Sequence, residues 1–225
     1  MKQLKFIHIS KTGGTTIETI GREHGIMWGL HHTEICPFEG AWHRVSADIP
    51  LDIRKHYDWF MVVRNPFTRI LSEMNFLNTY FDLDECKDIE AMNTILQNCL
   101  KNKHQFFDTS HEYYNHFRPQ VDYLDGTCRP YVLKFENLTV EFESLMKKYK
   151  LDIALTKHYN VSRRFYTLRD FDYTTIELIK EVYKNDFETF QYSTCIEDVD
   201  TTQYMSTTPD MGSSVENTST IISEM

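Results

Sequence analysis

Residues 4–16 read LKFIHISKTGGTT, a short apolar run followed directly by a lysine, two glycines and several threonines. Residues 4–9 have the length and the mainly apolar character of a buried strand. Gly13 and Gly14 can adopt the backbone angles of a tight turn. A strand that ends in such a turn and continues as a helix leaves backbone N–H groups pointing at one spot, which suits a phosphate or another oxyanion. The segment therefore predicts an anion-binding loop.

The side chains of this loop also fit an anion. Threonine hydroxyls donate hydrogen bonds, and Lys11 adds a mobile positive charge. In the P-loop of nucleoside triphosphatases, G-x-x-x-x-G-K-[ST], the lysine follows the glycines. Here it precedes them, so the loop is not a Walker A sequence, and taken alone it also fits an ordinary Gly-Gly turn. The candidate binding residues are Lys11, Thr12, Gly13, Gly14, Thr15 and Thr16.

Residues 59–76, WFMVVRNPFTRILSEMNF, repeat the same layout. A buried strand comes first, Arg64 stands at its end, and Asn65 followed by Pro66 is a favoured helix start. Apolar residues then recur at helical spacing, and Ser72 follows Arg64 by eight positions. Ligands of open α/β sheets gather at the carboxyl ends of the strands. Arg64 and Ser72 therefore predict a second anion site on the same edge.

The periodicities predict an α/β fold of three layers, with a central, mainly parallel sheet flanked by helices. The variable stretch 89–124 is expected to be mostly helical, and Asn137 or Thr139 is expected to cap the helix that follows the third strand. The expected strands are 4–9, 59–63 and 131–135, and the expected helices are 14–24, 66–80, 140–149 and 173–190.

The two anion motifs together resemble a known family. KFIHISKTGGTTIE is similar to the 5'-phosphosulfate loop of sulfotransferases, and VVRNPFTRILSE is similar to their 3'-phosphate motif. FRPQVDYL, YVLKFENLTVEFESLMKKY and VYKNDFETFQY continue the resemblance in order, so that it spans residues 4–192. The pattern is most like that of carbohydrate sulfotransferases of the heparan and chondroitin types, and of short microbial and viral relatives. The resemblance implies a P-loop-like fold.

The resemblance also implies an activity. A sulfuryl group would pass from 3'-phosphoadenosine 5'-phosphosulfate (PAPS) to a hydroxyl of an acceptor, such as a carbohydrate, by in-line transfer. Lys11 would neutralise charge on the leaving phosphate, and no metal ion is expected to take part. The 3'-phosphate would be bound by Arg64 and Ser72, with Ser162 and Arg163 as further contacts from a loop.

A histidine is the expected base, because its pKa lies near neutrality. The first candidate is His43, since WHRVSADIP at 42–50 resembles the family's histidine-containing segment between the two phosphate motifs. The alternative is His31 in GLHHTE. His8, inside the first strand, is expected to be a packed residue instead.

The composition predicts one globular domain over 1–197 and an acidic Ser/Thr-rich tail over 198–225. Residues 1–170 hold 22 Lys or Arg and 22 Asp or Glu, so the net charge of −9 comes entirely from the C-terminal quarter and need not repel an anionic ligand. Five widely spaced cysteines indicate reduced thiols. Without a signal segment or an apolar run long enough to span a membrane, a cytoplasmic enzyme with neither membrane nor nucleic-acid partners is expected.

Two other functions fit parts of the sequence. A catalytically inactive protein could retain the nucleotide cleft as an interaction module. A small-molecule kinase on a P-loop-like fold is the other alternative, but the chain lacks the GK[ST] order and a persuasive magnesium-binding aspartate after a strand.

Overall fold

The structure is a computed structural model, and it describes residues 2–29, 43, 45–81, 88–102, 115–124, 126, 129–156 and 164–199. Residues 77–81 are described by their backbone alone. The strands and α-helices, in chain order, are β1 (Leu4–Ile7), α1 (Gly14–Glu23), α2 (Leu51–His56), β2 (Asp58–Val63), α3 (Pro66–Phe81), α4 (Ile89–Lys101), β3 (Tyr131–Lys134), α5 (Leu138–Tyr149), α6 (Tyr173–Val182) and α7 (Lys184–Phe190). Short 3₁₀ turns η2 (Ser46–Asp48), η5 (Gln120–Tyr123), η6 (Phe135–Asn137), η7 (Leu168–Asp170) and η8 (Ile196–Asp198) lie between or after them.

The three strands form one parallel sheet in the order β1-β2-β3. Phe6 pairs with Phe60 in the first ladder, and Val63 pairs with Lys134 in the second. Parallel neighbours need long crossover connections, and the helices between the strands provide them. The predicted α/β class, with a parallel sheet flanked by helices, is thus confirmed.

Alternate residues of the strands bury opposite faces of the sheet, as the period of two requires. One face carries Phe6, Phe60 and Val62, which pack with α1 and α5. The other carries Met61 and Val63, which pack with residues around η2, η5 and the end of α7. Both faces are covered along the central strand β2, which explains why residues 59–63 are a continuous apolar run rather than an alternating one. The outer strand β3 is less covered, and its Val132 is exposed.

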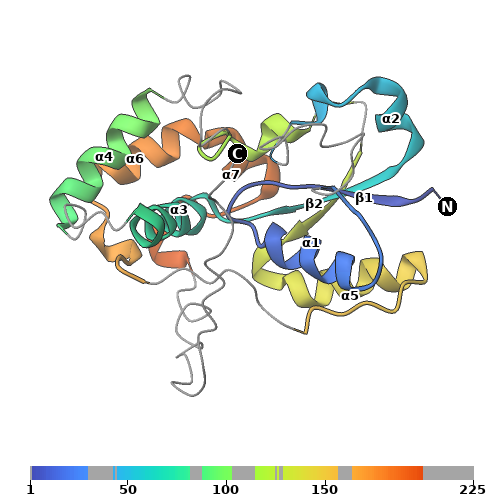
Figure 1. The fold of residues 1–225 in the computed structure, drawn as a ribbon. Helices are drawn as coiled ribbons and strands as arrows, with labels where there is room; N and C mark the ends of the chain where they lie inside the picture. The colour runs from blue at the N-terminus through green and yellow to red at the C-terminus, as the bar shows by residue number, and fades with distance from the viewer. Residues whose placement is uncertain are drawn as a thin grey trace, which may run out of the picture.

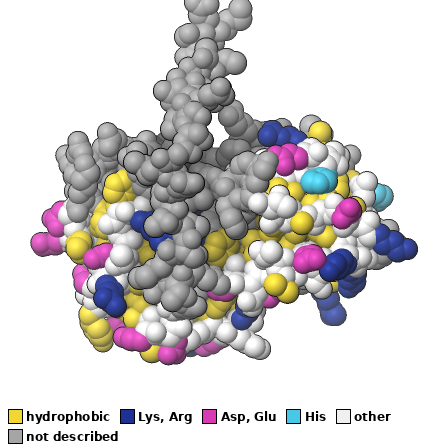
Figure 2. Space-filling model, turned by 90° about the horizontal axis from the view of Figure 1, so that it is seen from below, with side chains coloured by type: hydrophobic (Ala, Val, Ile, Leu, Met, Phe, Trp, Pro, Cys, Tyr) yellow, Lys and Arg dark blue, Asp and Glu magenta, His cyan; other side chains and the backbone are white. Residues whose placement is uncertain are grey.

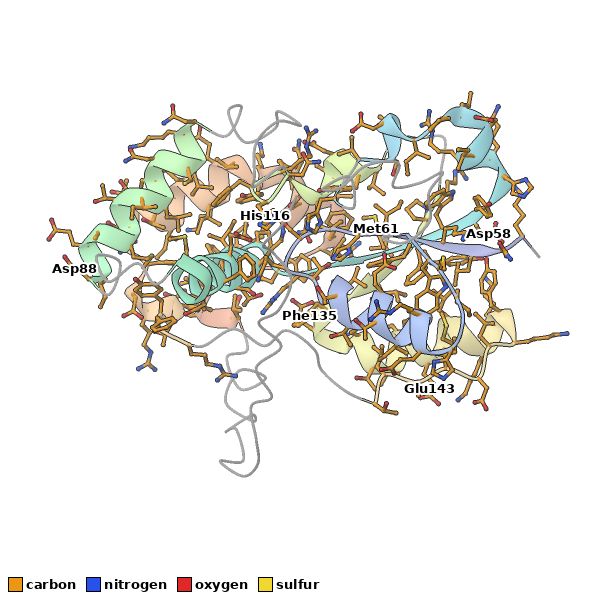
Figure 3. The ribbon with its side chains drawn as sticks, in the orientation of Figure 1. Asp58, Met61, Asp88, His116, Phe135 and Glu143 are labelled. Carbon is orange, nitrogen blue, oxygen red and sulfur yellow. The ribbon has the colours of Figure 1, made fainter. Side chains whose placement is uncertain are left out.

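A third apolar cluster joins α3, α4, α6 and α7. Figure 1 shows α1 and α5 together along one face of the sheet, while α3, α4 and α6 lie to one side of it, toward the carboxyl ends of the strands. The side-chain view agrees, because Asp58 at the start of β2 lies far from His116 and Phe135 near the strand ends (Figure 3). The edge where the sequence places both anion motifs is thus enclosed between the sheet and the helical cluster.

The helix predicted over 173–190 is broken in two. Tyr183, with φ −107° and ψ 21°, separates α6 from α7. Its fully buried side chain donates a hydrogen bond from its hydroxyl to the carbonyl of Phe117, at 2.9 Å. Both helices face the same core, so the helical spacing of apolar residues continues across the break. This spacing alone could therefore not reveal where the helix is interrupted.

Parts of the predicted organisation lie outside the described residues. Of the expected tail, only residues 198 and 199 are described, and the whole stretch 103–114 is likewise outside the described part. Within the described ranges, no helix is both long and apolar enough to cross a membrane. On the face in Figure 2, acidic and basic side chains are interspersed over the described surface, so the net acidity of the chain does not form one continuous acidic patch there.

Candidate functional site

Two chain segments meet at the carboxyl edge of the sheet. Lys11 follows β1, Arg64 follows β2 directly, and Nη1 of Arg64 donates a hydrogen bond to the carbonyl of Lys11 at 2.9 Å. The strands are adjacent and parallel, so their ends bring the two predicted anion motifs together. The structure thus places the main candidates of both motifs in one site.

The loop after β1 has a strained backbone. Lys11 has φ 61° and Gly13 has φ 83°, both in the left-handed region. A non-glycine residue in this region costs about 1–2 kcal/mol, so the loop around Lys11 is held by its surroundings. Gly13 serves as the N-cap of α1 without a side-chain cap, and its carbonyl accepts from the N–H groups of Thr16 and Ile17. The N–H groups of Gly14 and Thr15 lie in the first turn, where no earlier helical carbonyl can accept from them.

The threonines of the loop differ in their surroundings. Thr12 is fully buried and donates from Oγ1 to the carbonyl of Ile9 at 2.9 Å, so its hydroxyl closes the turn. Thr15 is exposed, whereas Thr16 is buried. Thr15 therefore offers the most accessible hydroxyl of the three.

Gly14 is required by close packing rather than by its backbone angles. A Cβ built at this position would lie 2.1 Å from Nε2 of His8. His8, predicted to be a packed residue, is indeed buried, and it lies just past the end of β1. The imidazole thus occupies the space that a side chain at the helix start would need.

The Arg64 side chain is buried and held on several sides. Besides its bond to Lys11, Nε donates to Oγ1 of Thr68 at 3.1 Å, and the guanidinium lies 4.2 Å from the ring centroid of Phe135. Burial lowers the pKa of Arg64 to about 9, although Glu136 acts in the opposite direction. The group stays cationic at neutral pH, and its planar fork of N–H donors suits a carboxylate or a phosphate.

Helix α3 begins as the sequence predicts. Oδ1 of Asn65 accepts from the N–H of Phe67 at 2.9 Å, which is an N-cap bond, and the N–H of Asn65 itself donates to Glu136. Ser72 is half-buried one turn after Thr68, the residue that contacts Arg64. Ser72 therefore lies on the same side of α3 as the Arg64 contact.

A buried polar network holds the main chain of Arg64. The side-chain amide of Gln120 accepts from the Arg64 N–H at 2.8 Å and donates to the Arg64 carbonyl at 2.9 Å. Asp186 of α7 is fully buried and accepts from the N–H groups of Gln120 and Val121 and from the Gln120 amide. Gln120 therefore continues the hydrogen-bonding of β2 past its end.

Three imidazoles follow one another beside the site. The ring centroids of His8 and His43 are 4.7 Å apart, and those of His43 and His116 are 5.1 Å apart. Nδ1 of His43 donates to the carbonyl of His8 at 3.0 Å, which places the lone pair of the neutral ring on Nε2. His43, the first candidate for the base, is thus joined through His8 to the end of β1, where the loop of Lys11 begins. No group of three His, Cys, Asp or Glu side chains in the described ranges is arranged to hold a metal ion.

Burial makes these groups hard to charge. The pKa of His8 is lowered to about 3 by burial, with a smaller effect of His116. Burial, with the neighbouring His8 and His116, also lowers the pKa of His43 well below its usual value. Lys11 is half-buried, and burial lowers its pKa to about 8 although Glu73 favours the charged form. Its ammonium lies 3.8 Å from the ring centroid of Phe76.

Sequence reasoning missed two buried charges of α3, Arg69 and Glu73. The Arg69 guanidinium donates to Ser10 through its carbonyl and its hydroxyl, and to the carbonyls of His116 and Arg118. It thereby ties the loop after β1 to residues 116–118. Both charges interrupt the buried side of a strongly apolar helix, and this is the signal that could have identified them.

Three predicted site residues lie outside the described part of the chain. They are the alternative base His31 and the loop contacts Ser162 and Arg163. The site can therefore be built only from Lys11 to Thr16, His43, Arg64 and Ser72 among the predicted residues.

Comparison with known proteins adds no relative. Neither a family model, nor a curated protein, nor a solved structure matches this chain.

Proposed function

We propose that the protein is a sulfotransferase that uses PAPS as the sulfuryl donor, on a P-loop-like fold. The observation that carries the proposal is the hydrogen bond that joins the two predicted anion motifs. The Arg64 guanidinium donates it to the main-chain carbonyl of Lys11. A donor with phosphate groups on its 3' and 5' sides needs two anion sites a fixed distance apart. A loop with a lysine and an open helix start, joined to a second loop with an arginine, meets this need.

The roles of the residues follow from their chemistry. The Lys11 ammonium and the first-turn N–H groups of α1 would stabilise charge that builds on the 5'-phosphate as the sulfuryl group leaves. Arg64 and Ser72 would bind the 3'-phosphate and fix the donor in line with the acceptor. A histidine of the cluster beside the loop would accept the hydroxyl proton, with His43 as the candidate from the sequence. No step of this mechanism uses a metal ion.

The order of the loop favours this donor over ATP. In the Walker A loop the lysine follows the glycines, and Mg²⁺ is held by the next Ser or Thr. Here Lys11 precedes Gly13, and the residue after the glycines is Thr15. This difference makes the kinase alternative the weaker one.

Calorimetry tests the choice of nucleotide. Adenosine 3',5'-bisphosphate, the product of PAPS, should bind more tightly than ATP. Arg22→Ala, at an exposed residue, is the control and should show the same difference in affinity between the two nucleotides. Tighter binding of ATP would contradict the proposal. Because both ligands are anionic, titrations at two salt concentrations separate specific binding from simple charge attraction.

Transfer of radiolabelled sulfate from PAPS tests the reaction itself. We expect labelled product from at least one carbohydrate in a panel of hydroxyl acceptors. Tight bisphosphate binding without transfer to any acceptor would instead favour the catalytically inactive interaction protein.

A further inference from the structure

A carboxylate and an imidazole form a buried pair beside the proposed donor site. Glu73 of α3 is fully buried, and its Oε1 lies 2.9 Å from Nδ1 of His116. The main-chain carbonyl of His116 accepts from Arg69 at 2.9 Å and from the hydroxyl of Ser10 at 3.2 Å. Side chain and backbone of His116 are therefore both held in place, by α3 and by the loop after β1.

The pair is built so that the carboxylate stays ionised. Burial alone would raise the pKa of Glu73, but His116, Lys11 and Arg69 together hold it below its usual value. A carboxylate that accepts from Nδ1–H places the lone pair of the neutral ring on Nε2. It also stabilises the imidazolium that forms when Nε2 takes up a proton.

The other two imidazoles are described with different partners. His43 donates from Nδ1 to a neutral carbonyl oxygen, that of His8. Nδ1 of His8 is buried and lies 3.9 Å from the nearest carboxylate oxygen, on Glu18. A positive charge on either ring would be placed among buried neighbours, and burial lowers the pKa of both.

The pair also faces the lysine that acts on the leaving group. Phe76 lies one turn after Glu73 on α3, with the Lys11 ammonium 3.8 Å from its ring centroid and the His116 ring 6.2 Å from it. Figure 3 shows His116 near the carboxyl end of the sheet, close to α3. In the part of the chain that the structure describes, the charged and titratable groups around the pair include Lys11, Arg69, His8, His43, Cys99 and Tyr183.

We propose that His116 is the base of the transfer and that Glu73 is its positioning residue. In the step, the acceptor hydroxyl oxygen forms a bond to sulfur while the bond from sulfur to the 5'-phosphate oxygen breaks. The hydroxyl proton goes to Nε2 of His116, and the departing electron pair stays on the phosphate. This assignment rests on the proposed sulfotransferase function, and it gives His116 the proton that the sequence assigns to His43.

Kinetics with chemical rescue test the role of His116. His116→Ala should lower kcat about 100-fold or more, with the affinity for adenosine 3',5'-bisphosphate changed less than about twofold. Added imidazole should restore part of the turnover of this variant but not that of Lys11→Ala. His56→Ala, at an exposed histidine of α2, is the matched control and should keep wild-type turnover. Near-normal kcat in His116→Ala would overturn the proposal, and loss of kcat in His43→Ala alone would return the role to His43.

The positioning role of Glu73 has a readout that needs no activity. Nitrogen NMR of the ring should find neutral His116 protonated on Nδ1 in the wild-type protein, and this preference should be lost in Glu73→Ala. Glu73→Gln, which keeps an acceptor oxygen and the side-chain volume, should retain both the tautomer and the fold. A neutral His116 ring protonated on Nε2 in the wild-type protein would overturn the proposed pairing of His116 with Glu73, even if sulfate transfer is observed. Conversely, the expected tautomer without any transfer would refute the proposed function and leave the pair intact.

Discussion

The guanidinium of Arg64 donates a hydrogen bond to the main-chain carbonyl of Lys11, with 2.9 Å between Nη1 and the oxygen. The contact links residues 53 positions apart in the sequence and joins the ends of β1 and β2. The bond is to a carbonyl oxygen and not to a carboxylate, so it leaves the guanidinium positively charged, a state that the nearby Glu136 also favours. Arg64 therefore holds the Lys11 loop in shape, and it is also the proposed ligand of an anion.

Arg64→Lys should separate these roles. Lysine keeps the charge but not the planar fork that reaches Lys11 and Thr68 together or stacks on Phe135. The dissociation constant for adenosine 3',5'-bisphosphate should rise about 10- to 100-fold, as expected for the loss of charge-assisted hydrogen bonds. Calorimetry measures it, with the exposed Arg22→Lys on α1 as the control. Unchanged affinity would show that any cation suffices at this position.

Lys11→Ala should act on turnover more than on binding. The ammonium is proposed to stabilise charge that develops only as the sulfuryl group leaves, so its loss should cut kcat about 100- to 1000-fold. The affinity for adenosine 3',5'-bisphosphate should fall by less than about tenfold. Steady-state kinetics and calorimetry on the same variant provide both values. The reverse pattern, a large loss of affinity at nearly normal kcat, would contradict the role assigned to Lys11.

The lowered pKa of Lys11 predicts an alkaline limit to activity. Its ammonium is protonated below about pH 8 and neutral above it, so kcat/KM of the free enzyme should fall above about pH 8. Arginine has a higher pKa than lysine, and burial still leaves the pKa of Arg64 at about 9. In Lys11→Arg, provided that this variant retains measurable turnover, the fall in activity should therefore move to about pH 9 or above, and a fall that stays at about pH 8 would have to come from another group.

The same shift makes a prediction about stability. The folded-state pKa of Lys11, about 8, lies below the unfolded value of 10.5, so between these pH values the unfolded chain binds more protons. The free energy of unfolding should therefore rise with pH through this window, and Lys11 is unfavourable to folding below it. Lys11→Met should unfold at higher urea concentration than the wild type at pH 7, with a smaller difference at pH 10. A variant less stable than the wild type at both pH values would refute this account.

Local patterns predicted most elements that position the site. The strands at β1, β2 and β3 and the helices α1, α3 and α5 were expected within a few residues of their observed bounds, because apolar periodicity and helix-start residues are local signals. The N-cap at Asn65 is confirmed, with its side chain bonded to Phe67. Asn137 occupies the N-cap position of α5 but makes no side-chain bond there, since the turn η6 precedes the helix.

Long-range polar contacts are what the sequence could not predict. Gln120 bonds Arg64 across 56 positions, and Glu73 bonds His116 across 43, with no repeat or spacing that marks either pair. Such partners are set by how the helical cluster docks at the sheet edge, a property of the tertiary packing. The bend at Tyr183 belongs to the same class, because its hydroxyl is bound to Phe117.

Gly14→Ala should destabilise the protein through one contact. The added methyl group would lie 2.1 Å from Nε2 of His8, so either the ring or the start of α1 must move. Overpacking of this kind costs about 1–3 kcal/mol in the free energy of unfolding. In the double variant with His8→Ala, the loss should be smaller than the sum of the two single losses, which a urea-unfolding cycle measures.

Gly25→Ala is the matched control for that cycle. Its Cβ would meet no atom within 4 Å, but φ is +71°, so only the backbone cost of about 1–2 kcal/mol applies. The loss of unfolding free energy in Gly25→Ala should simply add to the loss in His8→Ala, with no coupling between the two. Additive effects for Gly14→Ala as well would mean that the imidazole does not occupy the space beside the helix start.

Asp186→Asn should weaken both the fold and the donor site. The two carboxylate oxygens accept three hydrogen bonds from Gln120 and Val121, and all of these partners are N–H donors. An amide NH₂ in place of one oxygen would face an N–H group, at a cost of about 1–3 kcal/mol in urea unfolding. Gln120 would lose its support, so Arg64 should also bind adenosine 3',5'-bisphosphate more weakly. The exposed Asp52→Asn on α2 should change neither value, and a loss of stability without a loss of affinity would limit Asp186 to a structural role.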